Sequence, residues 1–172
     1  ISIPAAASFY KTDTQTQGTW KGVYGAEGVA ITNDVTNYPA YAQVSMSGQT
    51  PATWAASTTD IRALQKGSPT ATDRIASTWY TNTNFTTSFT IDINLVDGNA
   101  HQIAFYCLDW DYNGRAERID VLDASTNSVL DTRTISGFSN GIYLIWNLSG
   151  HVKIQITLTG GGNAVVSGIF FK

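Results

Sequence analysis

The sequence contains few charged residues, and this shortage excludes a class of partner. Lysine and arginine together number 10 and aspartate and glutamate 13, so charged side chains make up only 13% of the 172 residues, against about 25% in a typical soluble domain. The net charge is −3, and no run of basic residues occurs. Because nucleic acids and anionic membranes are bound through basic patches, we expect no nucleic-acid partner.

Cysteine and long apolar runs are equally scarce. Cys107 is the only cysteine, so the chain forms no intrachain disulfide and no cysteine-based zinc site. Apolar runs such as residues 142–146 have the length of a strand, far short of the ~20 residues that a helix needs to span a bilayer. We therefore expect a soluble chain without membrane insertion, in which Cys107 is simply buried.

Small polar residues and aromatic rings take the place of charge. Thr, Ser, Asn, Gln and Gly must cover most of the surface, a composition typical of extracellular β-proteins, while aromatic residues make up 12%. The length suits one domain, residues 1–172, which removes about 70% of its unfolded surface from water. The first residue is Ile1 rather than Met, which indicates a removed signal peptide or a module tethered to other domains of a larger polypeptide. We predict a secreted or cell-surface location.

Alternation of apolar and polar residues predicts the fold. Phe89, Ile91, Ile93 and Leu95 alternate with polar residues, as in a strand that buries one face. Residues 100–108 are apolar on both faces, which predicts a central strand. Further short strands, separated by turns, are predicted at residues 8–10, 28–32, 42–47, 52–55, 75–81, 119–122, 129–135, 142–148, 152–158 and 165–171. This spacing is typical of an all-β antiparallel sandwich or barrel.

Two connections carry signals of their own. The Ser-Gly pair at 149–150 stands between two alternating segments and predicts a tight hairpin that pairs them. Residues 60–66 carry the one helical signal, with an N-cap at Thr59 or Asp60 and Gly67 as the stop. The sequence therefore predicts a sandwich with one short helix.

The residues that usually carry catalysis are few. His101 and His151 stand at the polar starts of strands, without a nucleophile motif or the spacing of a metal pair, so we interpret them as solvated edge residues. A glycosidase needs two carboxylates, and the candidates are Glu27, Asp109, Asp111, Glu117, Asp120 and Asp123. Because most carboxylates on strand exteriors and turns only cap a turn or face water, we expect a chain that is not an enzyme.

The sharpest local motif begins at Asp109. Asp109, Asp111 and Asn113 stand at positions one, three and five, Gly114 at six and Asp120 at twelve, which matches the oxygen-ligand spacing of a calcium loop except that an Asp replaces the usual Glu. Such loops lie between helices, whereas this segment joins two predicted strands. One prediction is therefore a structural Ca²⁺ held by Asp109, Asp111 and Asn113. The alternative is a turn in which the Asp and Asn side chains bond their own backbone.

Aromatic residues in loops form the second candidate site. Trp20, Tyr24, Trp54, Trp110 and Tyr112 lie in or beside stretches rich in Gly, Thr and Asp, unlike the strand residues Trp79 and Trp146, which we assign to the core. Aromatic faces cover the apolar C–H patches of a pyranose, and planar polar side chains bind its hydroxyls. Asp111 and Arg115 are the candidates for those hydrogen bonds. Packing within the loops is the alternative reading of each ring.

Five segments of the chain resemble bacterial extracellular accessory domains with a galactose-binding-domain-like jelly roll, as found among carbohydrate-binding modules. They are TQGTWKGVYGAEG (16–28), YCLDWD (106–111), RAERIDVLD (115–123), GHVKIQIT (150–157) and NAVVSGIFF (163–171). The resemblance implies an antiparallel jelly-roll sandwich, often with a structural calcium, attached to secreted carbohydrate-active or surface proteins. It also implies that ligands bind on loops at one end of the sandwich, while the superfamily includes adhesion domains and spacers as well.

These observations together predict a non-catalytic carbohydrate-binding module whose partner is a polysaccharide or oligosaccharide. The expected site is formed by the loop residues Trp20, Tyr24, Trp54, Trp110, Asp111, Tyr112 and Arg115. An adhesion or protein-interaction module, with a larger apolar patch and no response to glycans, is the first alternative. A small glycan-cleaving enzyme and a structural spacer without a ligand are the others.

Overall fold

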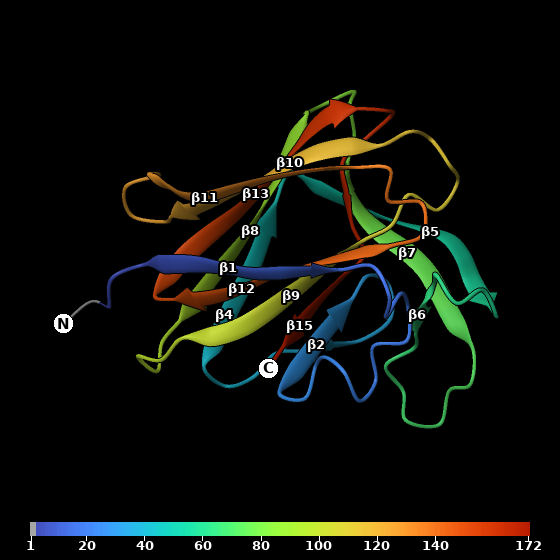
Figure 1. The fold of residues 1–172 in the computed structure, drawn as a ribbon, viewed down its shortest axis with the longest axis horizontal. Coiled ribbons are helices and arrows are strands. Elements are labelled where there is room, and N and C mark those ends of the chain that lie inside the picture. Colours follow the sequence, from blue (N-terminus) through green and yellow to red (C-terminus); the bar gives the residue numbers. More distant parts are fainter. Residues whose placement is uncertain (1–2) are drawn as a thin grey trace.

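The computed structural model describes residues 3–172 and consists of antiparallel β-strands joined by turns and loops (Figure 1). Two sheets form the body of the molecule. The six-stranded sheet has the order β1 (Ala6–Asp13), β12 (Ile142–Ser149), β9 (His101–Cys107), β15 (Gly168–Phe171), β2 (Gly28–Ile31), β3 (Thr36–Asn37). The five-stranded sheet has the order β11 (Val129–Ser136), β10 (Ala116–Asp123), β13 (His151–Gly160), β8 (Ser88–Leu95), β4 (Ala42–Ser47).

A smaller third sheet extends from one end of the sandwich (Figure 1). Its order is β14 (Val165–Val166), β7 (Arg74–Thr81), β5 (Gln49–Thr58), and β6 (Leu64–Gln65) pairs with β7. Every predicted strand segment overlaps an observed strand, so the prediction of an all-β antiparallel sandwich is confirmed. Residues 165–171 form two strands rather than one, because the chain leaves β7 after Val166 and joins the six-stranded sheet at Gly168.

The main hydrophobic core lies between the two large sheets. Alternate residues of β8 and β13, such as Ile91 and Ile154, meet Phe105 of β9 and Trp146 of β12 there. Cys107 is fully buried in this core, as predicted. No helix long and apolar enough to span a bilayer occurs within residues 3–172.

A second, aromatic core covers the outer face of the six-stranded sheet. Tyr106 of β9, Tyr143 of β12 and Phe170 of β15 meet Trp20 and Tyr24 from the long β1–β2 connection. The ring centroids of Tyr106 and Tyr143 are 4.5 Å apart, within the range of favourable aromatic pairs. Strand β9 thus buries both of its faces, which confirms the central strand predicted at residues 100–108 and explains why it carries no alternation.

The hairpin predicted at 149–150 is wrong. Strand β12 pairs with β1 and β9, whereas β13 pairs with β10 and β8, so Gly150 carries the chain from one sheet to the other. Both alternating segments bury their apolar residues in the same inter-sheet core: Leu148 and Val152 are each fully buried. Two strands that face one core from opposite layers show the same pattern as a hairpin, because alternation records burial and not the pairing partner.

The short helix predicted at 60–66 is also wrong. Asp60 does accept a hydrogen bond from the Arg62 amide at 2.9 Å, and Ala63 N bonds Asp60 O, but the turn stops there. Leu64 and Gln65 instead form β6 against β7. Leu64 is buried in the aromatic core. A helix of this length is marginal in water, so burial and strand pairing override the local signal.

The β11–β12 loop, residues 137–141, contains a glycine that is expected to tolerate no side chain. Gly141 has φ of 86°, and a Cβ there would lie 1.9 Å from the hydroxyl oxygen of buried Tyr106, which itself donates to Arg62 O at 2.7 Å. Gly141→Ala should lower the free energy of unfolding by about 2–4 kcal/mol, combining left-handed backbone strain with overpacking. Urea unfolding measures this. Gly137→Ala is the matched control, since Gly137 has φ of 65° and open space around it; equal losses in both variants would contradict the clash.

Candidate ligand-binding site

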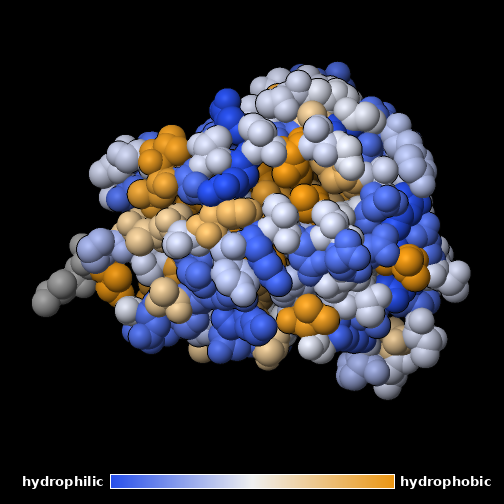
Figure 2. Space-filling view, in the orientation of Figure 1, coloured by the Kyte–Doolittle hydropathy of each residue, from blue (hydrophilic) through white to orange (hydrophobic). Residues whose placement is uncertain are grey.

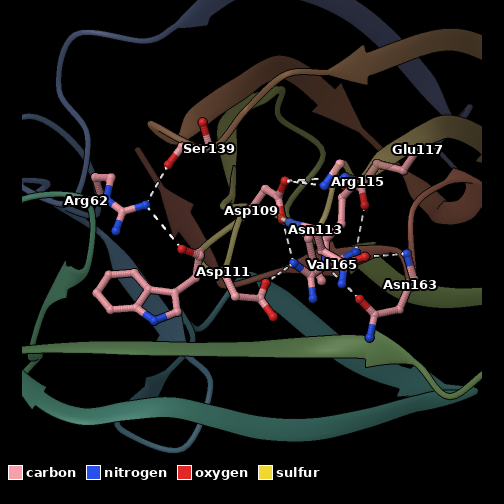
Figure 3. A network of polar contacts seen from close by, with 12 residues as sticks. Arg62, Asp109, Asp111, Asn113, Arg115, Glu117, Ser139, Asn163 and Val165 are labelled. Carbon is pink, nitrogen blue, oxygen red and sulfur yellow. Dashed lines mark hydrogen bonds and ion pairs between the residues drawn. The ribbon is translucent and has the colours of Figure 1, made fainter.

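The β9–β10 loop is organised around the carboxylate of Asp109. Its Oδ1 accepts a hydrogen bond from Asn113 N at 3.0 Å, and its Oδ2 accepts from Gly114 N at 3.0 Å and from Arg115 N at 3.3 Å (Figure 3). Burial alone would raise the pKa of Asp109, but hydrogen bonds from Arg115 and the loop amides outweigh it, so the net pKa lies below its usual range. The side chain is therefore held as a carboxylate that fixes the loop backbone.

Arg115 supplies the positive charge inside this loop. Its guanidinium donates through Nη1 to Asp109 Oδ1 at 2.5 Å and to Asp111 Oδ1, and through Nε to Asn163 Oδ1 at 2.7 Å. The guanidinium carbon lies 5.3 Å from the centroid of the Trp54 ring. Arg115 and Asp109 are both buried, so the pair is desolvated and links the β9–β10 loop, the β13–β14 turn and β5.

The same contacts bear on the predicted calcium ligands. Asp109 and Asp111 both bind Arg115, and Asn113 accepts Gly162 N at 2.7 Å through the side-chain oxygen that calcium would need. Within residues 3–172, no three His, Cys, Asp or Glu side chains are arranged to hold a metal ion. The donor set therefore does not fit Ca²⁺, because a guanidinium stands among its oxygens. The hydrogen bonds that Asp109 accepts from its own loop are those of the alternative, an Asp-stabilised turn.

Arg62 joins this loop to two others. From the β5–β6 connection it donates through Nη1 to Ser139 O at 2.9 Å and to Trp110 O at 3.3 Å (Figure 3). Through Nη2 it donates to Asp60 Oδ2 at 2.9 Å. Its guanidinium carbon lies 4.6 Å from the Trp110 ring centroid and 5.1 Å from that of Tyr112. These distances are typical of cation–π contacts. Arg62 therefore holds two aromatic rings of the β9–β10 loop at one end of the sandwich.

Tyr112 is the exposed ring of this arrangement. It is 70% exposed although Asp109 and Arg115 of the same loop are buried. Its φ is 55°, a left-handed conformation that is a true outlier for a bulky residue and costs about 1–3 kcal/mol. Such strain persists only where surrounding contacts impose it. The loop thus presents an aromatic ring to solvent from a rigid base, with the half-exposed side chain of Asp111 beside it in sequence.

Of the predicted site residues, Trp54, Trp110, Asp111, Tyr112 and Arg115 come together at this end, and two do not. Trp20 and Tyr24 lie in the aromatic core, 6% and 7% exposed. The Trp20 indole donates to Gln65 O at 2.7 Å, and the Tyr24 hydroxyl donates to Asp13 Oδ2 at 2.6 Å. Their rings cover the sheet rather than face solvent, so the ligand-binding role predicted for them has no surface on which to act.

Three residues of the network were not predicted from the sequence. Arg62 lies in the segment predicted as a helix, and Ser139 contributes only its carbonyl oxygen. Asn163 follows a glycine turn, 48 positions from the arginine it binds. None of the three belongs to a motif, because each acts through a partner far away in the chain.

Both histidines contact neighbouring residues in the described structure. His101 stacks on Tyr41 with ring centroids 3.6 Å apart and contacts Asp97 at 3.0 Å, and His151 contacts Asp92 at 2.7 Å. Among the other carboxylates considered for catalysis, Glu117 is fully buried, and Asp120 pairs with Arg118 at 2.8 Å.

Comparison with known proteins finds similarity in structure but not in sequence. No family model and no curated protein matches the sequence. Among solved structures, the chain is similar to a family 35 carbohydrate binding module from Clostridium thermocellum, with 14% identity over 74% of this chain and 90% of that chain and a TM-score of 0.42. It is also similar to TmCBM61, solved in complex with beta-1,4-galactotriose, with 10% identity over 77% and 88% of the two chains and a TM-score of 0.39. Both are carbohydrate-binding modules, the class that the sequence segments resemble. TM-scores of this size leave the ligand to be inferred from the chain's own residues.

Proposed function

We propose that this chain is a non-catalytic carbohydrate-binding module of a secreted or cell-surface protein, and that it binds glycan at the end of the sandwich that carries Tyr112. The observation that carries the proposal is the Tyr112 ring, which is 70% exposed on a strained backbone conformation while Asp109 and Arg115 of the same loop are buried. A strained, solvent-facing aromatic residue on a rigid base is a feature that folding alone does not favour.

The surroundings of the ring suit a sugar. An aromatic face covers the C–H face of a pyranose, and its hydroxyls need planar donors and acceptors. Asp111 offers a half-exposed carboxylate. Asn113 and Asn163 use their side-chain oxygens within the protein, and their amide nitrogens make no hydrogen bond to the residues described. The rigid base lowers the entropy cost of binding, but affinity stays modest because each hydroxyl exchanges a bond to water for one of similar strength.

Removing the ring should remove binding without unfolding the protein. We expect Tyr112→Ala to weaken binding of the responding glycan at least tenfold, with little change in melting temperature, because the ring is exposed. Thermal shift and titration calorimetry with soluble galactan, galactomannan, xylan and mixed-linkage β-glucan measure both quantities; binding to the folded state alone raises the melting temperature.

Tyr10→Ala is the matched control, because Tyr10 is 55% exposed on β1 and lies outside the Arg62 network; this variant should bind as the wild type does. Binding that survives Tyr112→Ala would contradict this site. A wild type that binds no glycan in the panel would contradict the proposal and favour the adhesion module or the spacer.

A further inference from the structure

A hollow of about 320 Å³ lies between the segment that follows β1 and the β11–β12 loop. Figure 2 shows this side of the molecule, with apolar surface in the hollowed strip between β11 and β1. The hollow is lined by four polar residues, two glycines and two apolar residues: Thr14, Gln15, Ser136, Asn140, Gly137, Gly141, Phe138 and Ile142. The volume is at the small end of the ~300–1,000 Å³ range of ligand pockets.

The lining selects the class of ligand. Two hydroxyls and two amides supply both donors and acceptors, and Ile142 supplies apolar contact. Phe138 is only 3% exposed and offers little surface of its own. None of the lining side chains is charged, so a carboxylate or sulfate group would lose hydration there without gaining a counter-charge. The chemistry fits a neutral, polyhydroxylated ring.

Both walls are fixed before a ligand arrives. The carboxylate of Asp13 accepts Gln15 N at 2.8 Å and the Thr16 hydroxyl at 2.6 Å, which shapes the segment after β1. On the other wall, Phe138 O accepts from Asp109 N at 3.2 Å, and the Gln17 side chain donates to Asn140 O at 3.1 Å. A preformed pocket of this kind loses little conformational entropy on binding.

The hollow and the Tyr112 ring are joined by one loop. Phe138 and Asn140 line the hollow, and the residue between them, Ser139, accepts from Arg62, which packs on Trp110 and Tyr112. We infer that the hollow is a second subsite of the proposed carbohydrate site, which takes a neutral sugar unit of the same glycan chain whose other unit stacks on Tyr112. This inference rests on the proposed function and adds that the ligand is a neutral oligosaccharide of several units.

The test is a length series. Neutral oligosaccharides of increasing length, prepared from the polysaccharide that responds in the panel, are titrated into the wild type and into the double variant Gln15→Ala/Asn140→Ala. The affinity of the wild type should rise with oligosaccharide length. The double variant should bind the longer oligosaccharides at least tenfold more weakly than the wild type, so that its affinity no longer rises with length. Ser136→Phe, which fills the hollow, is the second variant and should act in the same way. Gln155→Ala on the five-stranded sheet is the control and should bind as the wild type does.

The outcomes separate the two hypotheses. The second subsite is refuted if the double variant and Ser136→Phe both keep the length dependence of the wild type. The proposed function still stands in that case, provided that glycans bind the wild type and that Tyr112→Ala abolishes this binding. Polygalacturonate is titrated beside the panel as an acidic glycan, and a response confined to it would also overturn the neutral subsite. If the wild type binds no glycan of any length, both hypotheses fail together.

Discussion

Replacing Arg115 by methionine should lower the free energy of unfolding by about 3–5 kcal/mol, the usual cost of removing one partner from a buried ion pair. The side chains of Arg115 and Asp109 are 4% and 5% exposed, so neither water nor salt can replace the lost partner. Methionine keeps much of the volume of the arginine stem, and the loss therefore reports the charge and its hydrogen bonds rather than a cavity. Urea unfolding followed by tryptophan fluorescence measures the effect.

Two controls make this result specific. Adding Asp109→Asn to Arg115→Met should recover part of the stability, because the uncompensated buried charge is then gone. Arg133→Met should cost about 1 kcal/mol or less, since the Arg133 side chain is 40% exposed in its pair with Asp131. Because a guanidinium holds the loop, EDTA should leave the wild-type melting temperature unchanged. A loss below about 1 kcal/mol in Arg115→Met, or a clear destabilisation by EDTA, would contradict the structural role assigned to Arg115.

The stability of the protein should fall as pH rises between about pH 5 and pH 8 because of one carboxyl group in the core. Glu117 is fully buried, its Oε2 accepts Val165 N at 2.7 Å, and its Oε1 has no partner among the residues described. Burial raises its pKa to about 8, against about 4.3 in an unfolded chain. Between these values the folded chain keeps a proton that the unfolded chain releases, so folding loses about 1.4 kcal/mol per pH unit from this group.

Glu117→Gln isolates this contribution. The variant carries a neutral side chain of similar shape, so its stability should lack the decline, and the difference between wild type and variant should change by several kcal/mol across the window. Urea unfolding at a series of pH values between about 5 and 9 gives both curves. Contributions from all groups other than residue 117 are common to both proteins and cancel in the difference. A difference that does not change with pH would show that Glu117 has an ordinary pKa in the fold.

The fold was predictable from the sequence wherever a local pattern of apolar and polar residues indicates which side chains are buried. Alternation located the strands, and the doubly apolar segment 100–108 identified β9 as central. The two errors, the predicted hairpin and the predicted helix, concern which strands pair with one another. The pairing of β12 with β1 and β9, and of β6 with β7, depends on residues far away in the chain. A period of two indicates which face of a strand is buried, and a capping pattern indicates the secondary structure that an isolated segment prefers. Neither pattern predicts which strand will pair with the segment.

The candidate site was predictable in part for the same reason. The Asp109 motif was visible because its ligand-type residues are close in sequence, and five of the predicted residues do meet. The sequence did not reveal which positive group the motif binds, because the spacing of its oxygen-bearing residues is the same whether they bind calcium or the Arg115 guanidinium. Trp20 and Tyr24 were misplaced because a glycine-rich loop can either display an aromatic ring or fold it back onto a sheet. Arg62 was missed because its partners are separated from it by 48 and 77 positions.

The aromatic core on the outer face of the six-stranded sheet also bears on how the protein behaves at high concentration. Part of its cover is the connection between β1 and β2, which contributes Trp20 and Tyr24 beside Leu64 of β6 and Ile75 of β7. A loop can open locally at a lower free energy than the whole chain unfolds. Opening here would uncover the rings of Tyr143 and Phe170, which Trp20 and Tyr24 contact, and exposed apolar patches lead to self-association. We therefore expect the two buried loop aromatics to protect the molecule against aggregation, a role independent of any ligand.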